Sequence, residues 1–226
     1  MTTERDGEEM INFDRQAAWQ SERTAADYDS QRFNSIGGRF YDFAEKRAIG
    51  ALLAVAGRKQ PIDRVLDIPC GTGRILHWLL QVGYRVECAD VSSAMIDVAK
   101  QRIGDAAGLI GFDVLDVFQI ARARDSYDCV SCIRLFQHFG SDERIATLRE
   151  LARVSKRYVL VNVMYSSGYY AFLRKLRQIL GRYAPRNTVD SNDLGRESAA
   201  AGLRIVASRF AQPGYSGNLV VLMERS

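Results

Sequence analysis

Two acids and two glycines in this chain stand at spacings that suit a ligand site. Asp67 ends a short apolar run that is typical of a buried strand, and the turn Gly71-Thr72-Gly73 leads from it into a predicted helix. Such a turn has no Cβ to keep the backbone away from a ligand, and the start of the helix offers free N–H groups. Asp90 ends the next predicted strand, where a carboxylate can accept hydrogen bonds from both hydroxyls of a ribose.

The residues around this turn distinguish between two classes of ligand. A dinucleotide site needs a third glycine three residues after the second, and Leu76 occupies that position. A carboxylate at Asp67 would repel a pyrophosphate but attract a cation. S-adenosylmethionine carries an ammonium and a sulfonium and no phosphate. Residues 67–74 resemble the first motif of the class I S-adenosylmethionine-dependent methyltransferases, in which an acid, a Gly-x-Gly turn and a downstream acid recur.

The order of predicted elements agrees with the fold that this resemblance implies. We expect strands at 63–68, 84–89, 109–113, 127–133, 157–164, 203–210 and 217–224, and helices at 72–82, 93–103, 142–154, 169–181 and 191–201. Strands that alternate with helices predict a parallel sheet covered on both faces. The last two strands are joined by only residues 211–216, too few for a crossover helix, so they should form an antiparallel hairpin. The prediction is an α/β fold with a seven-stranded, mostly parallel, doubly wound sheet and an antiparallel C-terminal hairpin strand.

Length and composition favour one soluble domain. The chain has 226 residues, of which 47% are hydrophobic, and no apolar run is long enough to span a bilayer. We expect residues 1–11 to be a disordered tail and residues 12–226 to be a single methyltransferase domain. Residues 12–57 should form a helical N-terminal cap that is interrupted at 34–38 and closed by Gly57. The polar N-terminus does not resemble a signal peptide, which favours the cytoplasm.

The four cysteines are explained as buried core residues of a reduced protein. Cys129-x-x-Cys132 resembles half of a zinc site, but there is no second pair and the chain has only two histidines. We therefore expect no metal, and the default compartment is again the cytoplasm.

The resemblance implies which residues hold the cofactor. They are Asp67, Pro69, Cys70, Gly71, Gly73, Arg74, Asp90, Val91, Met95, Asp113, Val114 and Cys132. Asp113 ends the third strand, where the family has an acid for the adenine amino group; Asp116 is the competing candidate, and either acid could instead cap the following turn. Pro69 stands where the family commonly has glycine, so the turn should have one backbone donor fewer.

Residues 25–32 resemble the family segment that lies over the methionine end of the cofactor. Tyr28 and Arg32 would then contact the cofactor, with Arg32 available for its carboxylate. The alternative is an amphipathic helix with an incidental tyrosine.

The loop after the fourth strand carries the candidate catalytic residues Arg134 and His138. A neutral His138 could take a proton from an acceptor hydroxyl or amine. It could equally fix the loop by a hydrogen bond to a neighbouring group, and methyl transfer from a sulfonium depends mainly on in-line positioning. The acceptor should enter over Arg134 and over the residues after the fifth strand, namely Tyr165, Tyr169, Tyr170 and Arg174.

Residues 166–189 form a lid-like helical insertion with five basic residues and no acid. Three interpretations compete: a lid over an anionic or aromatic small molecule, a peripheral contact with anionic lipid, which is not favoured, and a helix packed on the sheet with a solvated basic face. The net charge of +4 is concentrated in this segment, so no nucleic-acid partner is expected.

The function that these observations favour is transfer of a methyl group to oxygen, nitrogen or carbon of a small-molecule acceptor. One alternative is an enzyme that uses S-adenosylmethionine as its own substrate, for example by intramolecular cyclisation. Another is a non-catalytic, methyltransferase-like partner subunit. Nothing in the sequence indicates the oligomeric state.

Replacement of Asp90 by alanine tests the ribose assignment. Asp90→Ala should weaken binding of S-adenosylhomocysteine by roughly 1.5–3 kcal/mol, because two charge-assisted hydrogen bonds are lost. Calorimetry with the wild-type and variant proteins measures this change, with NAD as a ligand that should bind to neither. An unchanged affinity would remove the ribose assignment.

Overall fold

The computed structural model describes residues 35–166, 168–179, 187–214 and 216–226. The expected tail and the cofactor candidates Tyr28 and Arg32 lie outside these residues. The strands are β1 (Arg64–Asp67), β2 (Arg85–Asp90), β3 (Leu109–Val114), β4 (Tyr127–Cys132), β5 (Ser155–Met164), β6 (Leu203–Phe210) and β7 (Asn218–Arg225). The helices are α3 (Ile36–Lys59), α4 (Arg74–Gln81), α5 (Ser93–Ile103), the 3-10 turn η1 (Phe136–His138), α6 (Ser141–Val154), α7 (Gly168–Ile179) and α8 (Ser191–Ala200).

The seven strands form one sheet in the order β3-β2-β1-β4-β5-β7-β6. β1 pairs in parallel with β2 and β4, β2 with β3, and β4 with β5. β7 lies between β5 and β6 and is antiparallel to both. The predicted sheet with its C-terminal hairpin is therefore confirmed. The strand order reverses direction at β1 and β4, and ligands of open α/β sheets bind outside the carboxyl ends of strands at such a point.

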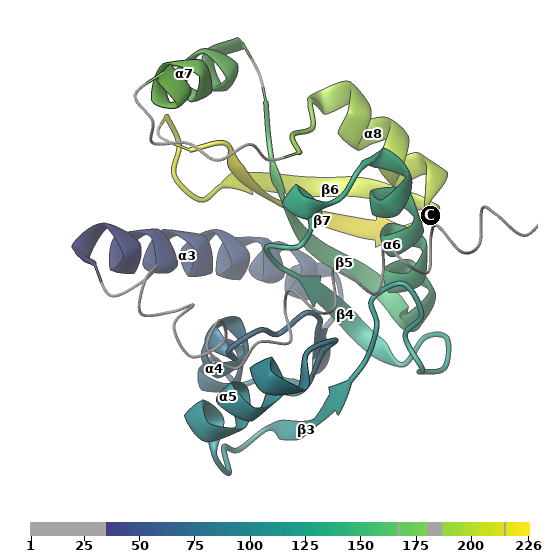
Figure 1. Cartoon of the computed structure of the whole chain (residues 1–226). Helices are drawn as coiled ribbons and strands as arrows, with labels where there is room; N and C mark the ends of the chain where they lie inside the picture. Colours follow the sequence, from purple (N-terminus) through teal and green to yellow (C-terminus); the bar gives the residue numbers. More distant parts are fainter. Residues whose placement is uncertain (1–34, 167, 180–186, 215) are drawn as a thin grey trace, which may run out of the picture.

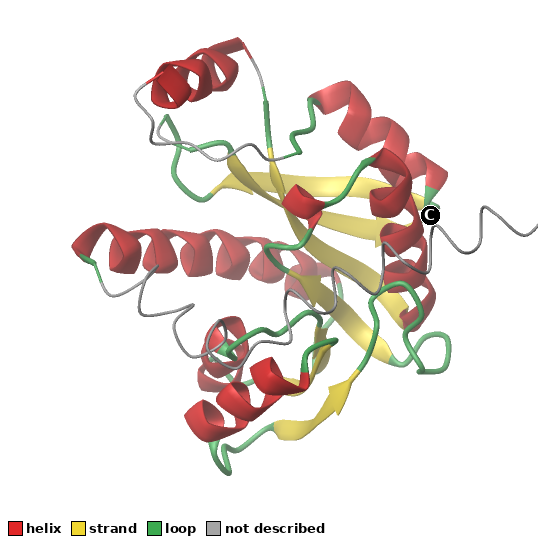
Figure 2. Ribbon diagram, in the orientation of Figure 1, coloured by secondary structure: helices red, strands yellow, loops and turns green. Residues whose placement is uncertain are grey.

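Helices cover both faces of the sheet and enclose two hydrophobic cores (Figures 1 and 2). One core lies under α6 and α8, and the other lies under α3, α4 and α5. Successive strand residues face opposite cores: Cys129 packs into the second core, and Val130 packs into the first. The central strands are buried on both sides, which explains their nearly continuous apolar sequence.

Helix α3 differs from the expected N-terminal cap. Ser35 caps it by accepting a hydrogen bond from the N–H of Gly38 at 3.0 Å, so residues 35–38 mark the start of this helix. Gly57 does not end the helix, which continues to Lys59. A helical glycine costs about 1 kcal/mol relative to alanine, and the buried face of α3, which includes Leu52 and Leu53, compensates for it by packing on the sheet.

Helix α7 stands apart from the two sheet faces (Figure 1). Its Tyr169 hydroxyl donates to the carbonyl of Gly214 at 3.0 Å, and the N–H of Gly214 donates to the Tyr170 hydroxyl at 3.1 Å. The side chains of Phe172 and Ile179 are 65% and 75% exposed. Among the described residues, α7 contacts Gly214 of the β6–β7 loop and the ring of Phe210 at the end of β6. The three interpretations of residues 166–189 stay predictions.

The two glycines of the turn after β1 are required for different structural reasons. Gly73 has a φ of +77°, and a Cβ there would lie 3.1 Å from the Cβ of Ala99 on α5. Gly71 has a φ of +52° with open space before it. The sequence analysis explained both glycines by the close approach of a ligand to the backbone. At Gly73 that explanation is incomplete, since the backbone conformation and the packing of α5 already require glycine.

Substitution of Gly73 by alanine should therefore destabilise the protein without any ligand present. We expect a loss of roughly 1–3 kcal/mol in the free energy of unfolding, from the left-handed backbone and the contact with Ala99. Gly57→Ala is the matched control, because Gly57 is helical with nothing within 4 Å of an added Cβ, and it should stabilise by about 0.5–1 kcal/mol. Urea denaturation measures both, and equal effects would contradict the assignment.

Candidate active site

A cavity of about 140 Å³ lies at the carboxyl ends of β1, β2 and β4. It brings together the predicted residues Asp67, Pro69, Cys70, Gly71, Arg74, Asp90, Val91, Met95, Arg134 and His138, and it adds Thr72, Ile75, Ile133 and Leu135. Parallel pairing explains this convergence, because Asp67 lies beside Cys88 of β2 and Ser131 of β4. Segments that are far apart in the sequence therefore end at one edge of the sheet.

Asp90 shapes the turn that lines this cavity. One carboxylate oxygen accepts from the N–H of Gly71 at 2.9 Å, and the other accepts from the N–H of Ser92 at 3.0 Å. Burial raises the pKa of Asp90, and these backbone donors oppose the rise. The carboxylate thus fixes the glycine turn against β2 while it faces the cavity.

Asp67 is the most unusual group in the site. Its side chain is 1% exposed, and neither carboxylate oxygen has a hydrogen-bond partner among the described residues. Burial raises the pKa of Asp67 to about 7, and the charge of Asp90 adds to this. The Ser131 hydroxyl, which lies near the carboxylate but does not meet hydrogen-bond geometry, and the charge of Arg74 act against the rise. A buried carboxylate without donors is unfavourable, so a ligand that brings a positive charge or donors to this position would relieve the cost.

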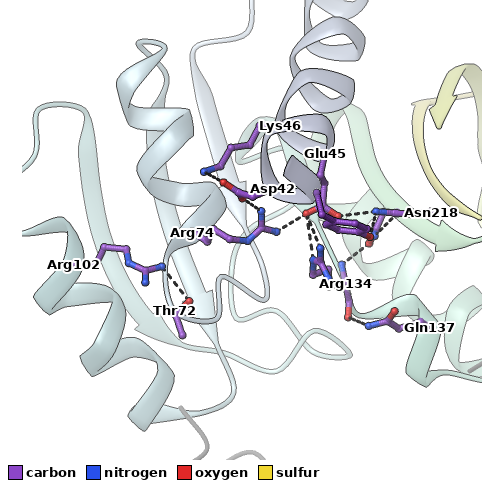
Figure 3. Close-up of polar contacts among 11 residues, drawn as sticks. Asp42, Glu45, Lys46, Thr72, Arg74, Arg102, Arg134, Gln137 and Asn218 are labelled. Atoms are coloured by element: carbon purple, nitrogen blue, oxygen red, sulfur yellow. Dashed lines mark hydrogen bonds and ion pairs between the residues drawn. The ribbon is translucent and has the colours of Figure 1, made fainter. Parts of the chain in front are cut away.

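Arg74 and Arg134 connect the cavity to α3 through one buried carboxylate, Glu45 (Figure 3). Glu45 accepts from Arg74 at 2.5 Å, from Nε and Nη2 of Arg134 at 3.2 Å each, and from the amide of Asn218 at 2.9 Å. Arg74 also pairs with Asp42 one turn earlier on α3. The guanidinium of Arg134 stacks over the ring of Tyr41 at 4.6 Å.

The network determines the charge state and the backbone of its members. Burial disfavours ionisation of Glu45, but the charges of Arg134 and Arg74 and the amide of Asn218 outweigh it and hold the pKa of Glu45 below its usual range. Arg134 has a φ of +70°, and its N–H donates to the side chain of Asn162. The predicted site residue Arg134 is thus held rigidly in place between the sheet and α3.

Sequence reasoning missed Glu45 and Asp42. A signal for Glu45 was available, because it shares a helical face with the apolar residues Ile49, Leu52 and Ala56. An acid on an apolar face indicates a buried charge that needs a partner, although its partners could not be identified from the sequence.

His138 lines the cavity with an exposed side chain at the end of η1. Its Nε2 lies 3.1 Å from Nε2 of Gln137. The donor and the acceptor in this contact depend on the tautomer of the His138 ring. The general-base role stays a prediction, and the contact with Gln137 supports the alternative that His138 fixes the loop.

Other predicted residues lie outside this cavity. Asp113 pairs with Arg122 at 2.6 Å, which holds the pKa of Asp113 below its usual range, and Val114 is 52% exposed. Asp116 accepts from the N–H of Phe118 at 2.9 Å, in the turn-capping arrangement that was the alternative for both acids. The adenine assignment of Asp113 and Val114 stays a prediction.

The remaining predicted residues surround the site at a distance from its centre. Cys132 is buried in the core under α6 and α8. Tyr165 packs edge-on against Phe210 at 5.8 Å, and Tyr169 and Tyr170 contact the β6–β7 loop. Arg174 lies on α7. Their roles toward the acceptor stay predictions.

Comparisons with known proteins agree with this geometry. Residues 65–157 match the family model described as a methyltransferase domain. These residues, fewer than half of the chain, resemble a methyltransferase domain. The matched residues run from β1 to the start of β5, and therefore include Asp67, the glycine turn, Asp90 and the Arg134–His138 loop.

Individual methyltransferases share less of the chain. Ubiquinone biosynthesis O-methyltransferase of Coxiella burnetii is 28% identical over 36% of this chain and 35% of its own length. Magnesium-protoporphyrin O-methyltransferase of Synechocystis is 26% identical over 48% of this chain and 47% of its own length. The matches thus span only a third to a half of these curated relatives. The crystal structure of the Synechocystis enzyme with bound S-adenosylhomocysteine superposes with a TM-score of 0.75 and 17% identity, over 95% of this chain and 100% of that one, which shows a common fold.

Two further properties of the described residues concern metals and membranes. No group of three histidine, cysteine, aspartate or glutamate residues within them could hold a metal ion. No described helix has both the length and the apolarity to cross a membrane.

The raised pKa of Asp67 predicts pH-dependent binding of a cationic ligand. The affinity of the wild-type protein for S-adenosylhomocysteine, which carries an ammonium, should rise about tenfold between pH 5.5 and 7.5 as Asp67 ionises. Asp67→Asn should bind weakly at both pH values. Calorimetry across this range measures the slope, and Asp97→Asn, which changes an exposed acid on α5, should retain the wild-type slope.

The raised pKa of Asp67 also makes the stability of the unliganded protein depend on pH. Stability should fall with rising pH, whereas the affinity for the ligand should rise. The pKa of about 7 in the folded protein exceeds the ordinary value of 3.8, so the folded state binds the proton more tightly. Stability from this group is fully present below pH 3.8 and is lost as the pH rises to about 7. Asp67→Asn should therefore gain stability over the unliganded wild type as the pH rises from 5 to 7.5. A constant difference in urea denaturation would argue against a buried, unpartnered carboxylate.

Proposed function

We propose that this protein transfers the methyl group of S-adenosylmethionine to a small-molecule acceptor, at an oxygen atom. The observation that carries the proposal is the buried carboxylate of Asp67, which has no donor among the described residues and faces a cavity beside Asp90 and the glycine turn. A ligand with both an ammonium and a ribose fits these two acceptors. The carboxylate of Asp67 would accept hydrogen bonds from the ammonium, and Asp90 lies at the end of the next strand, where it would accept from the ribose.

The residues of the chain bind and orient the reactants. Asp67 holds the ammonium, Asp90 accepts from the ribose hydroxyls, and the open space before Gly71 allows a close backbone approach. S-adenosylmethionine would supply a methyl group bound to its sulfonium sulfur. When the methyl group is transferred, this sulfur becomes a neutral thioether, which is the leaving group. The chain therefore has to align the acceptor atom and exclude water, while any proton from the acceptor passes to solvent or to His138.

The choice of oxygen rests on the relatives. The curated proteins quoted above are named O-methyltransferases that act in ubiquinone biosynthesis and on magnesium protoporphyrin. They align with this chain over the cofactor half of the fold, so they support the acceptor atom less strongly than the cofactor.

We further propose a single methyltransferase domain that works in the cytoplasm without nucleic acid or a stable membrane contact. All four cysteines are free and buried, as expected in a reducing compartment.

Binding and product analysis together test the function against its alternatives. We expect S-adenosylhomocysteine to bind with micromolar affinity, about −7 to −8 kcal/mol, and S-adenosylmethionine to stay intact when incubated with the protein alone. Mass spectrometry with a methyl-labelled cofactor should show label transfer when an acceptor such as magnesium protoporphyrin or an extract of small molecules is added. Breakdown of the cofactor without any acceptor would favour the intramolecular reaction. Failure to bind either cofactor form would favour a non-catalytic partner subunit.

A further inference from the structure

A second and larger cavity adjoins the first at Arg134. Its volume is about 820 Å³, against about 140 Å³ beside the glycine turn. Helix α3 forms one wall. The other wall is formed by Met164 at the end of β5, by the end of β6, and by Ala211, Gln212, Pro213 and Ser216. Arg134 lines both cavities. Ligands in the two cavities would therefore meet at this side chain, which is the arrangement that transfer between them requires.

Aromatic side chains dominate the apolar part of the larger cavity. Phe40 and Phe43 on α3 are 63% and 62% exposed, and Phe210 faces them from β6. The ring of Phe210 packs against the rings of Tyr165 and Tyr170, at centroid distances of 5.8 and 5.0 Å. Large exposed rings that gather at one cavity indicate a surface that an apolar ligand covers.

The polar part of this cavity is positive. Arg47 projects from α3, Arg209 from β6, and Arg134 from the β4 loop, whereas no acidic side chain lies among the described lining residues. Arg134 shares the charge of Glu45. Within the described part of the chain neither Arg47 nor Arg209 pairs with a carboxylate. Two arginines from opposite walls thus have no counter-charge among the residues that the structure describes.

We propose that the acceptor is an aromatic small molecule that bears a carboxylate, held by Arg47 and Arg209. This inference rests on the proposed function, because it assigns the larger cavity to the acceptor. A guanidinium forms two parallel hydrogen bonds to one carboxylate, and the rings of Phe40, Phe43 and Phe210 pack against the aromatic body.

Fluorescent pyrene derivatives test the charge preference without knowledge of the natural acceptor. The probes are 1-pyrenebutyrate, the neutral 1-pyrenebutanol and the cationic 1-pyrenemethylamine, titrated against the full-length wild-type protein. We expect 1-pyrenebutyrate to bind at least tenfold more tightly than 1-pyrenebutanol, and 1-pyrenemethylamine to bind most weakly. Equal binding of the anionic and neutral probes would overturn the proposal, and this comparison does not depend on any variant.

A pair of double variants assigns the effect to this cavity. Arg47→Gln with Arg209→Gln should reduce 1-pyrenebutyrate binding about tenfold, to the level of 1-pyrenebutanol. Arg58→Gln with Arg124→Gln removes the same charge from two exposed arginines that do not line the cavity, and it should leave binding unchanged. Equal losses in both double variants would show a general charge effect and overturn the proposal. A fall in the melting temperature of the unliganded Arg47/Arg209 variant alone would mean that these arginines pair within the chain, which would also overturn it.

Calorimetry with S-adenosylhomocysteine on the wild-type protein and both double variants distinguishes failure of the acceptor inference from failure of the proposed function. Binding should be the same in the wild-type protein and in both double variants. If the wild-type protein binds S-adenosylhomocysteine but does not distinguish the anionic probe, the acceptor inference fails and the proposed function remains. If it does not bind S-adenosylhomocysteine, the proposed function fails regardless of the pyrene result.

Discussion

One buried carboxylate, Glu45, determines how α3 meets both halves of the candidate site. It accepts from Arg74 at the start of α4 and from Arg134 after β4, and it is held by Asn218 of β7. A buried ion pair gains little net stability, but loss of one partner typically costs 3–5 kcal/mol, because a charge is left uncompensated. The network therefore specifies geometry: it fixes the position of α3 and the direction of the Arg134 side chain together.

Asp67 differs from Glu45, because its buried carboxylate oxygens have no hydrogen-bond partner among the described residues. Burial raises the pKa of Asp67 to about 7, since the charged form loses its solvation. The two acids at the strand ends thus differ in their contacts: Asp90 accepts from the backbone of the glycine turn, whereas the binding of a ligand by Asp67 belongs to the proposed function.

Helix α3 contacts the residues of both cavities. Glu45 pairs with Arg74 and Arg134, which line the smaller cavity, while Phe40 and Arg47 line the larger one. The family model matches residues 65–157, from β1 to the start of β5, and therefore includes neither α3 nor the β6–β7 loop.

The sequence by itself determined the local units: strand, glycine turn, helix, and the acids at strand ends, because hydrophobic period and turn chemistry act over a few residues. It also indicated a mostly parallel sheet with an antiparallel C-terminal hairpin, because strands alternate with helices until the last two, whereas the order of the strands was found only in the structure. Only the tertiary structure decided which charges meet. Glu45 and Asn218 are 173 residues apart and Glu45 and Arg134 are 89 apart, and no local pattern encodes such a pairing. The same holds for Gly73, whose need for glycine comes from Ala99 on a neighbouring helix as well as from its own backbone. Burial and long-range contact, which set charge states and steric limits, exist only once the chain is folded.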